Sequence, residues 1–105
     1  MRYRWSALEF EWDDAKFEAN LRKHGIDFRD AATVFGDPLA ADFDDARHSK
    51  DERRMYTVGY TERNDLLFVL YVTRADHGVD VLRLISARRA DPKERRNHEQ
   101  SRKGR

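Results

Sequence analysis

Residues 66–85 read LLFVLYVTRADHGVDVLRLI, two apolar runs separated by the polar segment Ala75-Asp76-His77-Gly78. Both runs are rich in Val, Leu and aromatic residues, and turn-forming residues lie between them, which is the pattern of a β-hairpin. We therefore predict strands from Leu66 to Thr73 and from Val79 to Ile85, paired antiparallel.

The preceding residues extend this hairpin into a meander. Met55 to Thr61 shows the alternation of a half-buried strand, and Glu62-Arg63-Asn64-Asp65 supplies a short turn into the next strand. Leu39 to Phe43 is predicted as an additional edge strand. The expected sheet is therefore antiparallel, with three to four strands.

Two helices are predicted before the sheet. Asp13 or Asp14 caps the first, which runs from Lys16 to His24, and Gly25 ends it in the left-handed conformation. The positions expected to face the core are Phe17, Leu21 and His24. A second, shorter helix begins at Asp27 or Asp30 and ends at Gly36 and the Asp37-Pro38 step.

A closing helix follows the sheet. Asp91 is expected at its N-cap, Pro92 at its first position and Glu94 at its third, so the helix runs from Pro92 to about Ser101. The fold class is therefore α+β, with two N-terminal helices, a three- to four-stranded antiparallel sheet and a C-terminal helix. We interpret residues 1–105 as a single domain with a core over residues 10–101 and a frayed tail at 102–105.

The composition excludes several classes of protein. The 105 residues contain no cysteine, which excludes disulfides, thiolate catalysis and cysteine-based zinc sites. The N-terminus lacks the apolar run of a signal peptide, and no window is apolar enough to span a bilayer. We expect a cytoplasmic protein with no membrane association.

Positive charge is concentrated at the C-terminal end. Residues 83–105 hold nine positive and three negative side chains, a balance of +6, whereas residues 1–82 hold 12 and 17, a balance of −5. Guanidinium groups match phosphate oxygens bidentately, so Arg83, Arg88 and Arg89 are candidates for holding a polyanion such as RNA or DNA. Arg95 and Arg96 are secondary candidates. The alternative is a solvated helix face with salt bridges to acidic neighbours, Glu94 and Glu99.

An acid–base cluster is predicted before the first strand of the meander. His48 exchanges protons near neutral pH, Glu52 can orient it or act as a base, and Arg53 lies beside them. The alternative is a helix cap or a pair that only braces the loop. His98, on the closing helix, is a second titratable group near the arginines, whereas His24 is interpreted as a structural group at a helix end.

Two further residues are candidates for contacting RNA, and the absence of several motifs limits the reactions to be considered. Tyr71 would stack on a base if it faced the open side of the sheet, and Ser86 would assist in positioning a phosphate. The sequence contains no P-loop and no dinucleotide fingerprint, and its four histidines are too dispersed to indicate zinc. We therefore predict neither a cofactor nor a metal.

Five motifs are spaced along the chain: Phe10-Glu11-Trp12-Asp13, Asn20-Leu21-Arg22-Lys23-His24-Gly25, Phe35-Gly36-Asp37-Pro38, His48-Ser49 and Ile85-Ser86-Ala87-Arg88-Arg89-Ala90. Together, and in this order, they resemble a known family, the BrnT toxins of bacterial toxin–antitoxin pairs. The resemblance implies a RelE-like ribonuclease fold, RNA cleavage that arrests growth, and a hetero-oligomer with a neutralising antitoxin, BrnA, through which operator DNA is bound. The chain departs from the family at Asn97-His98, where an aromatic residue, often Tyr, is usual.

The resulting hypothesis is metal-independent cleavage, in which the RNA 2′-hydroxyl attacks the neighbouring phosphate. His48 or Glu52 would act as the base, and Arg83, Arg88 and Arg89 would hold the phosphate and stabilise its transition state. Arg53 and Ser86 would assist, while Tyr71, Arg95, Arg96 and His98 would contact RNA. The alternative is a non-catalytic module that binds nucleic acid or a protein partner through its basic surface.

Overall fold

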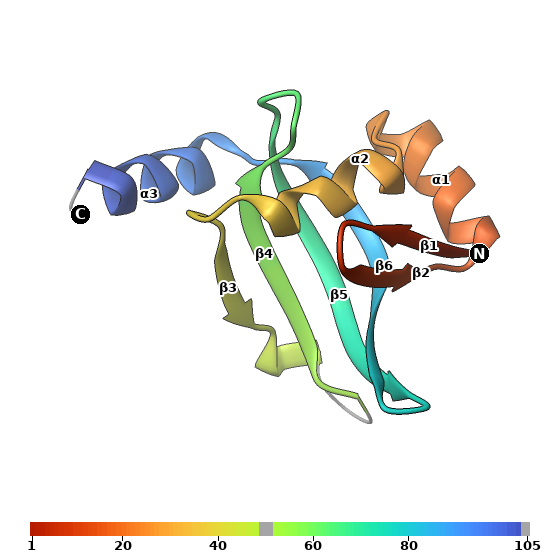
Figure 1. The fold of residues 1–105 in the computed structure, drawn as a ribbon. Coiled ribbons are helices and arrows are strands. Elements are labelled where there is room, and N and C mark those ends of the chain that lie inside the picture. Colours follow the sequence, from red (N-terminus) through yellow and green to blue (C-terminus); the bar gives the residue numbers. More distant parts are fainter. Residues whose placement is uncertain (49–51, 104–105) are drawn as a thin grey trace.

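A computed structural model of the chain describes residues 1–48 and 52–103 and shows a sheet with helices on one face and at one end (Figure 1). The elements in chain order are β1 (Arg2–Trp5), β2 (Leu8–Glu11), α1 (Asp14–His24), α2 (Phe28–Ala32), the 3-10 helix η1 (Thr33–Gly36), β3 (Ala41–Asp44), the 3-10 helix η2 (Ala46–His48), β4 (Arg54–Tyr60), β5 (Leu66–Asp76), β6 (Val79–Arg89) and α3 (Pro92–Lys103). Within the described residues, no helix is long and apolar enough to cross a membrane.

The sheet has six strands in the order β1-β2-β6-β5-β4-β3. The antiparallel meander β4-β5-β6 is confirmed, and so is the edge strand, which runs over Ala41–Asp44 rather than Leu39 to Phe43. The prediction of a purely antiparallel sheet of three to four strands was wrong. The first eleven residues form a hairpin, β1-β2, and β2 pairs with β6 in parallel. No local turn signal announces a parallel pair, because its connection runs through the intervening helices and strands.

A β-bulge in β6 decides which side chains face the core. Leu70 pairs with Ser86 and Tyr71 pairs with Leu84, so Ile85 is the extra residue between them. In a regular strand, two residues three positions apart face opposite sides of the sheet. The bulge instead keeps both Leu84 and Ala87 on the buried face. Helices α1 and α2 lie toward this face, and the opposite face of the sheet is the open face (Figure 1).

The capping residues predicted for α1 and α3 are confirmed. Asp13 caps α1 by accepting from the backbone amides of Ala15 and Lys16, and Gly25 adopts a left-handed φ of 69° at its end. At α3, the Glu94 amide donates to Asp91 Oδ1 at 2.7 Å and the Asp91 amide donates to Glu94 Oε1 at 2.9 Å, a complete capping box. The first helix begins at Asp14, two residues earlier than predicted.

The core face of α1 agrees with the prediction at Phe17, which packs against the core, and differs from it at Leu21. Leu21 is 43% exposed, whereas Asn20 is 5% exposed and is the buried residue of the helix. The reason is that α1 lies along the edge of β6, where a polar side chain can replace a neighbouring strand. Asn20 Oδ1 accepts from the Ala87 amide at 3.0 Å, and Nδ2 donates to the carbonyls of Ala87 at 2.9 Å and Ile26 at 3.1 Å.

Candidate nucleic-acid interface

The strand β6 carries the arginines that the sequence singled out, and alternation divides them between the two faces. Arg83 and Arg88 lie opposite Val72 and Phe68 of β5, on the open face. Arg89 lies opposite Leu67, whose side chain belongs to the buried core. The side chain of Arg89 is therefore directed toward the helix-covered face, away from the open face. The three arginines therefore do not converge on one point.

Arg83, at the amino end of β6, belongs to an ion-pair network. Glu11 on β2 accepts from Arg74 through both carboxylate oxygens, with Nη2 to Oε1 at 2.6 Å, and Arg83 Nη1 lies 3.9 Å from Oε2. The hydrogen bond from Arg74 is the main reason that the pKa of Glu11 is lowered. A phosphate at this end would compete with a carboxylate that already neutralises the arginines.

Arg88, at the carboxyl end, fixes α3 to the sheet. Its two terminal nitrogens donate to the carboxylate of Glu94 at 2.7 and 2.9 Å, and its guanidinium lies 4.2 Å from the centre of the Phe68 ring. This confirms the ion pair with Glu94 that was the alternative interpretation for this arginine. Arg89, Arg95 and Arg96 are exposed, and none of the three pairs with a carboxylate among the described residues.

A hollow of about 240 Å³ lies between α1 and β6. Its lining residues are Lys16, Ala19, Asn20, Lys23, His24, Ile85 and Ser86. Burial is the main reason that the pKa of His24 is lowered, and the positive charges of Lys23 and Arg88 lower it further. Burial and the surrounding cations therefore favour the neutral form of His24.

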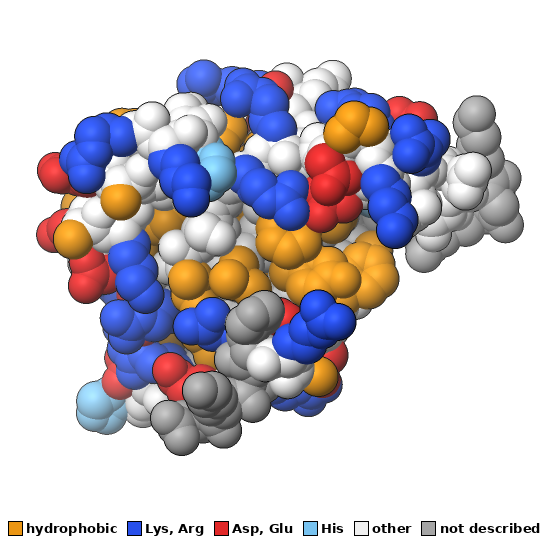
Figure 2. Space-filling view, turned by 180° about the vertical axis from the view of Figure 1, so that it is seen from behind, with side chains coloured by type: hydrophobic (Ala, Val, Ile, Leu, Met, Phe, Trp, Pro, Cys, Tyr) orange, Lys and Arg blue, Asp and Glu red, His pale blue; other side chains and the backbone are white. Residues whose placement is uncertain are grey.

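Aromatic rings line the open face on the other side of Arg88. Phe43, Tyr56 and Phe68 come from the neighbouring strands β3, β4 and β5, and they stack with centroid distances of 5.0 and 4.7 Å. We call Phe43, Tyr56, Phe68 and Arg88 the aromatic ladder. Figure 2 shows this face, with Lys, Arg and one His side chain gathered beside a hydrophobic patch. Basic groups next to exposed rings are the surface that single-stranded nucleic acids use.

The predicted acid–base cluster lies at the other end of the sheet. Glu52 precedes β4 near Arg74, and Arg74 is six residues along β5 from Phe68, roughly 20 Å at the rise of a strand. Arg53 Nη2 lies 3.0 Å from Asp44, the loop-bracing arrangement that was the alternative for this segment. His48 ends η2, and its side chain lies outside the described part of the structure. The structure thus separates this cluster from Arg88.

Tyr71 and His98 are buried rather than presented to a ligand. Tyr71 is 6% exposed on the core face, where its hydroxyl donates to Asp42 at 3.1 Å, and burial raises its pKa. His98 is 5% exposed and packs edge-on against Tyr60 at 5.8 Å. Stacking of Tyr71 on a base required the open face, so this geometry removes Tyr71 from the interface. His98, although buried, lines a hollow between α3 and the strands β3 and β4.

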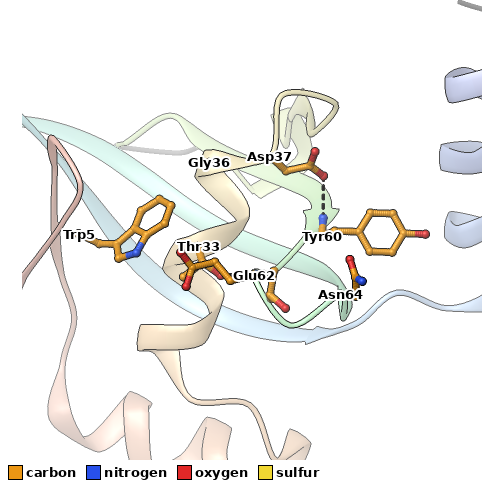
Figure 3. Close-up of a pocket in the computed structure, with 8 residues that line it drawn as sticks. Trp5, Thr33, Gly36, Asp37, Tyr60, Glu62 and Asn64 are labelled. Atoms are coloured by element: carbon orange, nitrogen blue, oxygen red, sulfur yellow. Dashed lines mark hydrogen bonds between the residues drawn. The ribbon is translucent and has the colours of Figure 1, made fainter.

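A second hollow, of about 340 Å³, lies over η1 and the β4–β5 turn (Figure 3). Its polar groups hold loops together: Asp37 Oδ2 accepts from the Tyr60 amide at 2.8 Å, and Thr33 Oγ1 accepts from the Glu62 amide at 3.0 Å. Gly36 is required here because an added Cβ would lie 2.4 Å from the Trp5 ring. The carboxylates of Asp37 and Glu62 make this hollow unsuitable for a phosphate.

Two features of the interface were missed by the sequence interpretation. Asn20 was quoted within a motif without a role, although a polar residue between apolar helix positions is a signal for a buried hydrogen bond. The aromatic ladder depends on strand register, which the sequence did not provide. No three His, Asp or Glu side chains within the described ranges form a group suited to a metal ion.

Comparison with known proteins identifies a matching family model and similar solved structures. A family model described as the ribonuclease toxin BrnT of type II toxin–antitoxin systems matches residues 12–94. The crystal structure of the ribonuclease toxin BrnT from Brucella abortus is similar, with a TM-score of 0.56 and 25% sequence identity, and the alignment covers 78% of this chain and 95% of that chain. None of the curated proteins matches.

Proposed function

Because the chain belongs to the BrnT family of ribonuclease toxins, we propose that it cleaves RNA on the open face at the carboxyl end of β6. The observation that carries this proposal is the arrangement around Arg88. A neutral histidine, His24, lies in a basic hollow on one side, and the aromatic ladder lies on the other. Arg95 and Arg96 on α3, which pair with no carboxylate among the described residues, add exposed positive charge after β6.

The proposed reaction uses the nucleophile that RNA itself carries. The 2′-oxygen attacks the adjacent phosphorus, its proton passes to the imidazole of His24, and the 5′-oxygen leaves with a proton from water. The products are a 2′,3′-cyclic phosphate and a free 5′-hydroxyl. Lys16 and Lys23 would stabilise the additional negative charge on the phosphate, where positioned cations contribute several kcal/mol.

This assignment changes the base that the sequence suggested. His48 and Glu52 were proposed as the base, but Glu52 belongs to the end of the sheet where Arg74 and Glu11 lie. His24 lies within electrostatic range of Arg88, and its lowered pKa keeps it able to accept a proton at pH 7. Arg83 is assigned to the ion-pair network, while Arg89 remains a proposed phosphate contact beside α3.

The biological part of the proposal follows from the family. A type II toxin acts on RNA in the cell that makes it, so expression of the free chain is expected to arrest growth. A BrnA-type antitoxin would neutralise it in a hetero-oligomeric complex, and operator DNA would be bound only through that complex. An exposed basic and aromatic surface offers such a partner a direct means of blocking the site.

The test is incubation of the purified chain with total RNA in excess EDTA, read on a denaturing gel. The parent should degrade the RNA to fragments with cyclic phosphate ends, and His24→Asn should be at least 100-fold slower. His77→Asn is the matched control because His77 is exposed in the turn after β5. Equal rates for parent and His24→Asn would overturn the assignment of the base.

The same experiment separates the alternative function. A non-catalytic module would leave the RNA intact and retain it in a salt-sensitive manner. Arg88→Ala is a poor first variant, because losing the guanidinium also leaves Glu94 without its partner and frees α3. Lys23→Gln removes a cation from the basic hollow without breaking a described ion pair, so it is the better charge variant.

A further inference from the structure

A narrow slot lies between α3 and the strands β3 and β4, on the open face. Its volume is about 210 Å³, and its lining residues are Ala41, Phe43, Tyr56, Val58, Glu94, Asn97, His98 and Ser101. The floor is therefore apolar and aromatic, while the wall formed by α3 carries amide, hydroxyl and carboxylate groups. None of these side chains takes part in the cleavage reaction described above.

The aromatic ladder ends in this slot at Phe43. One face of the Phe43 ring is covered by Tyr56, with an interplanar angle of 21° and a centroid distance of 5.0 Å. β3 is the edge strand, so no neighbouring strand supplies a side chain for the other face, and Phe43 is 45% exposed. The stack of rings therefore leaves one face of Phe43 open to a further planar group.

The size and the charge of the surroundings identify that group. An α-helix with its side chains is about 10–12 Å wide and does not fit a slot of this volume, whereas a single planar ring does. The wall belongs to α3, and residues 83–105 carry a balance of +6, so a planar ligand that brings phosphate groups with it is favoured electrostatically. An unstacked nucleobase has both properties.

We propose that the slot binds one nucleobase of the RNA substrate, packed against Phe43 and contacted at its edge by Asn97 and Ser101. The slot would then select the nucleotide near which the chain cuts, and this inference rests on the proposed ribonuclease function. Both carboxylate oxygens of Glu94 are held by Arg88, so the amide of Asn97 is the group free to distinguish bases. Asn97 and Ser101 lie beyond the residues 12–94 that the family model matches.

The experiment measures binding without cleavage. Four fluorescein-labelled RNA pentamers, fully 2′-O-methylated and differing only in the central base, are titrated with the chain and followed by fluorescence anisotropy. Phe43→Leu should weaken binding of the preferred pentamer about tenfold, because base–aromatic stacking contributes that much per base. Phe43→Trp should bind as tightly as the parent. Asn97→Ala should reduce the spread of affinities among the four pentamers.

Val79→Ala is the matched control, since Val79 is 47% exposed but lies at the far end of the sheet. It should bind all four pentamers as the parent does. Thermal unfolding of every variant excludes a loss of fold as the cause. Pentamer affinities unchanged by Phe43→Leu would overturn the proposal, and loss of a bound antitoxin in that variant would then assign the ladder to a protein contact.

The outcomes also separate this proposal from the ribonuclease assignment. The 2′-O-methyl pentamers cannot be cleaved, so their binding is independent of catalysis. A chain that leaves total RNA intact but loses pentamer binding through Phe43→Leu contradicts the proposed function and supports the slot. A chain that degrades RNA while Phe43→Leu retains the parent's affinities and cleavage sites contradicts the slot alone.

Discussion

The two ends of β6 both carry arginines, but they differ in how much of the positive charge is neutralised by carboxylates. At the amino end, Arg83 shares Glu11 with Arg74, and the carboxylate is only 15% exposed. At the carboxyl end, Arg88 is paired with Glu94, while the neighbouring Arg89 and, on α3, Arg95 and Arg96 have no carboxylate partner among the described residues. One end is a neutralised structural contact, and the other has a surplus of positive charge.

The two ends also differ in what holds the edge of the strand. Residues 81–83 of β6 pair with β2, so an ordinary strand covers that part of the edge. Four residues later, the side chain of Asn20 takes the place of a strand by bonding both backbone groups of Ala87. A neutral amide thus stabilises the basic end without reducing its charge, whereas a carboxylate at that position would have neutralised part of it.

The largest effect is expected where this amide is removed. Asn20→Ala leaves the Ala87 amide and two carbonyls without partners in a buried site, so the free energy of unfolding should fall by about 3 kcal/mol. Leu21→Ala, next to it on α1 but exposed, should change it by less than about 0.5 kcal/mol. Urea unfolding measures both, and equal losses in the two variants would contradict the role of Asn20.

A smaller and pH-dependent effect is expected at the ionic end. The pKa of Glu11 is lowered in the folded state, mainly by the hydrogen bond from Arg74, so its ionised form stabilises the fold. This stabilisation is present above the unfolded pKa near 4.5 and is lost as the pH falls through the lower folded value. Glu11→Gln should therefore be less stable than the parent at pH 6, by less than Asn20→Ala.

The difference between parent and Glu11→Gln should shrink as the pH is lowered from 6 to 3, because the parent's carboxylate becomes protonated. Urea unfolding of both proteins at each pH isolates Glu11 from other acidic groups. Glu18→Gln is a suitable control, since Glu18 is exposed on α1. A difference that stays constant over this range would show that Glu11 acts by packing rather than by charge.

Local signals predicted much of the fold, and long-range contacts supplied the remainder. Asp13, Gly25 and the Asp91–Glu94 capping box were predicted because each acts within four residues of itself. The pairing of β2 with β6 joins Phe10 to Leu82, far apart in the chain, and no local pattern specifies it. The first strand was missed for the same reason, since a four-residue strand has little periodicity of its own.

Prediction of the site was limited in the same way, because contacts between distant residues have no local pattern. The sequence correctly indicated that the carboxyl end of β6 is basic, and the family resemblance was confirmed by the match over residues 12–94. It did not show that Arg83 would have Glu11 as a neighbour, because that carboxylate comes from the other end of the chain. The side chains of His24 and Arg88 come from separate elements, and only the packing of α1 beside β6 relates them.

The salt dependence of RNA binding should distinguish the two ends. The slope of log K against log salt is negative, and removing a cation that contacts phosphate reduces its magnitude by about 0.7 for single-stranded RNA. Arg95→Ala combined with Arg96→Ala should therefore lower it by about 1.4, whereas Arg83→Ala should leave it near the parent value. Anisotropy titrations of a 2′-O-methyl RNA at salt concentrations from about 50 to 200 mM measure these slopes. Equal changes of the slope in Arg83→Ala and in the double variant would contradict the difference in charge between the two ends of β6.

The smallest effect is a shift in the titration of His24. Burial is the main cause that lowers its pKa, and Lys23 and Arg88 add positive charge near the ring. Lys23→Gln removes one of these charges and makes protonation easier, so the pKa should rise while burial keeps it below 6.5. Lys93→Gln, an exposed charge on α3, should leave it unchanged. Imidazole NMR signals followed from pH 4 to 8 give both values.

The same shift has a consequence for the rate of RNA cleavage. A base must be unprotonated to accept the 2′-hydroxyl proton, so the rate should rise with pH through the pKa of His24 and then level off. Because Lys23→Gln raises that pKa, the rising part of its profile should move to higher pH together with the NMR titration. A profile that does not follow the imidazole titration would show that another group accepts the proton, even if His24 lies beside the phosphate.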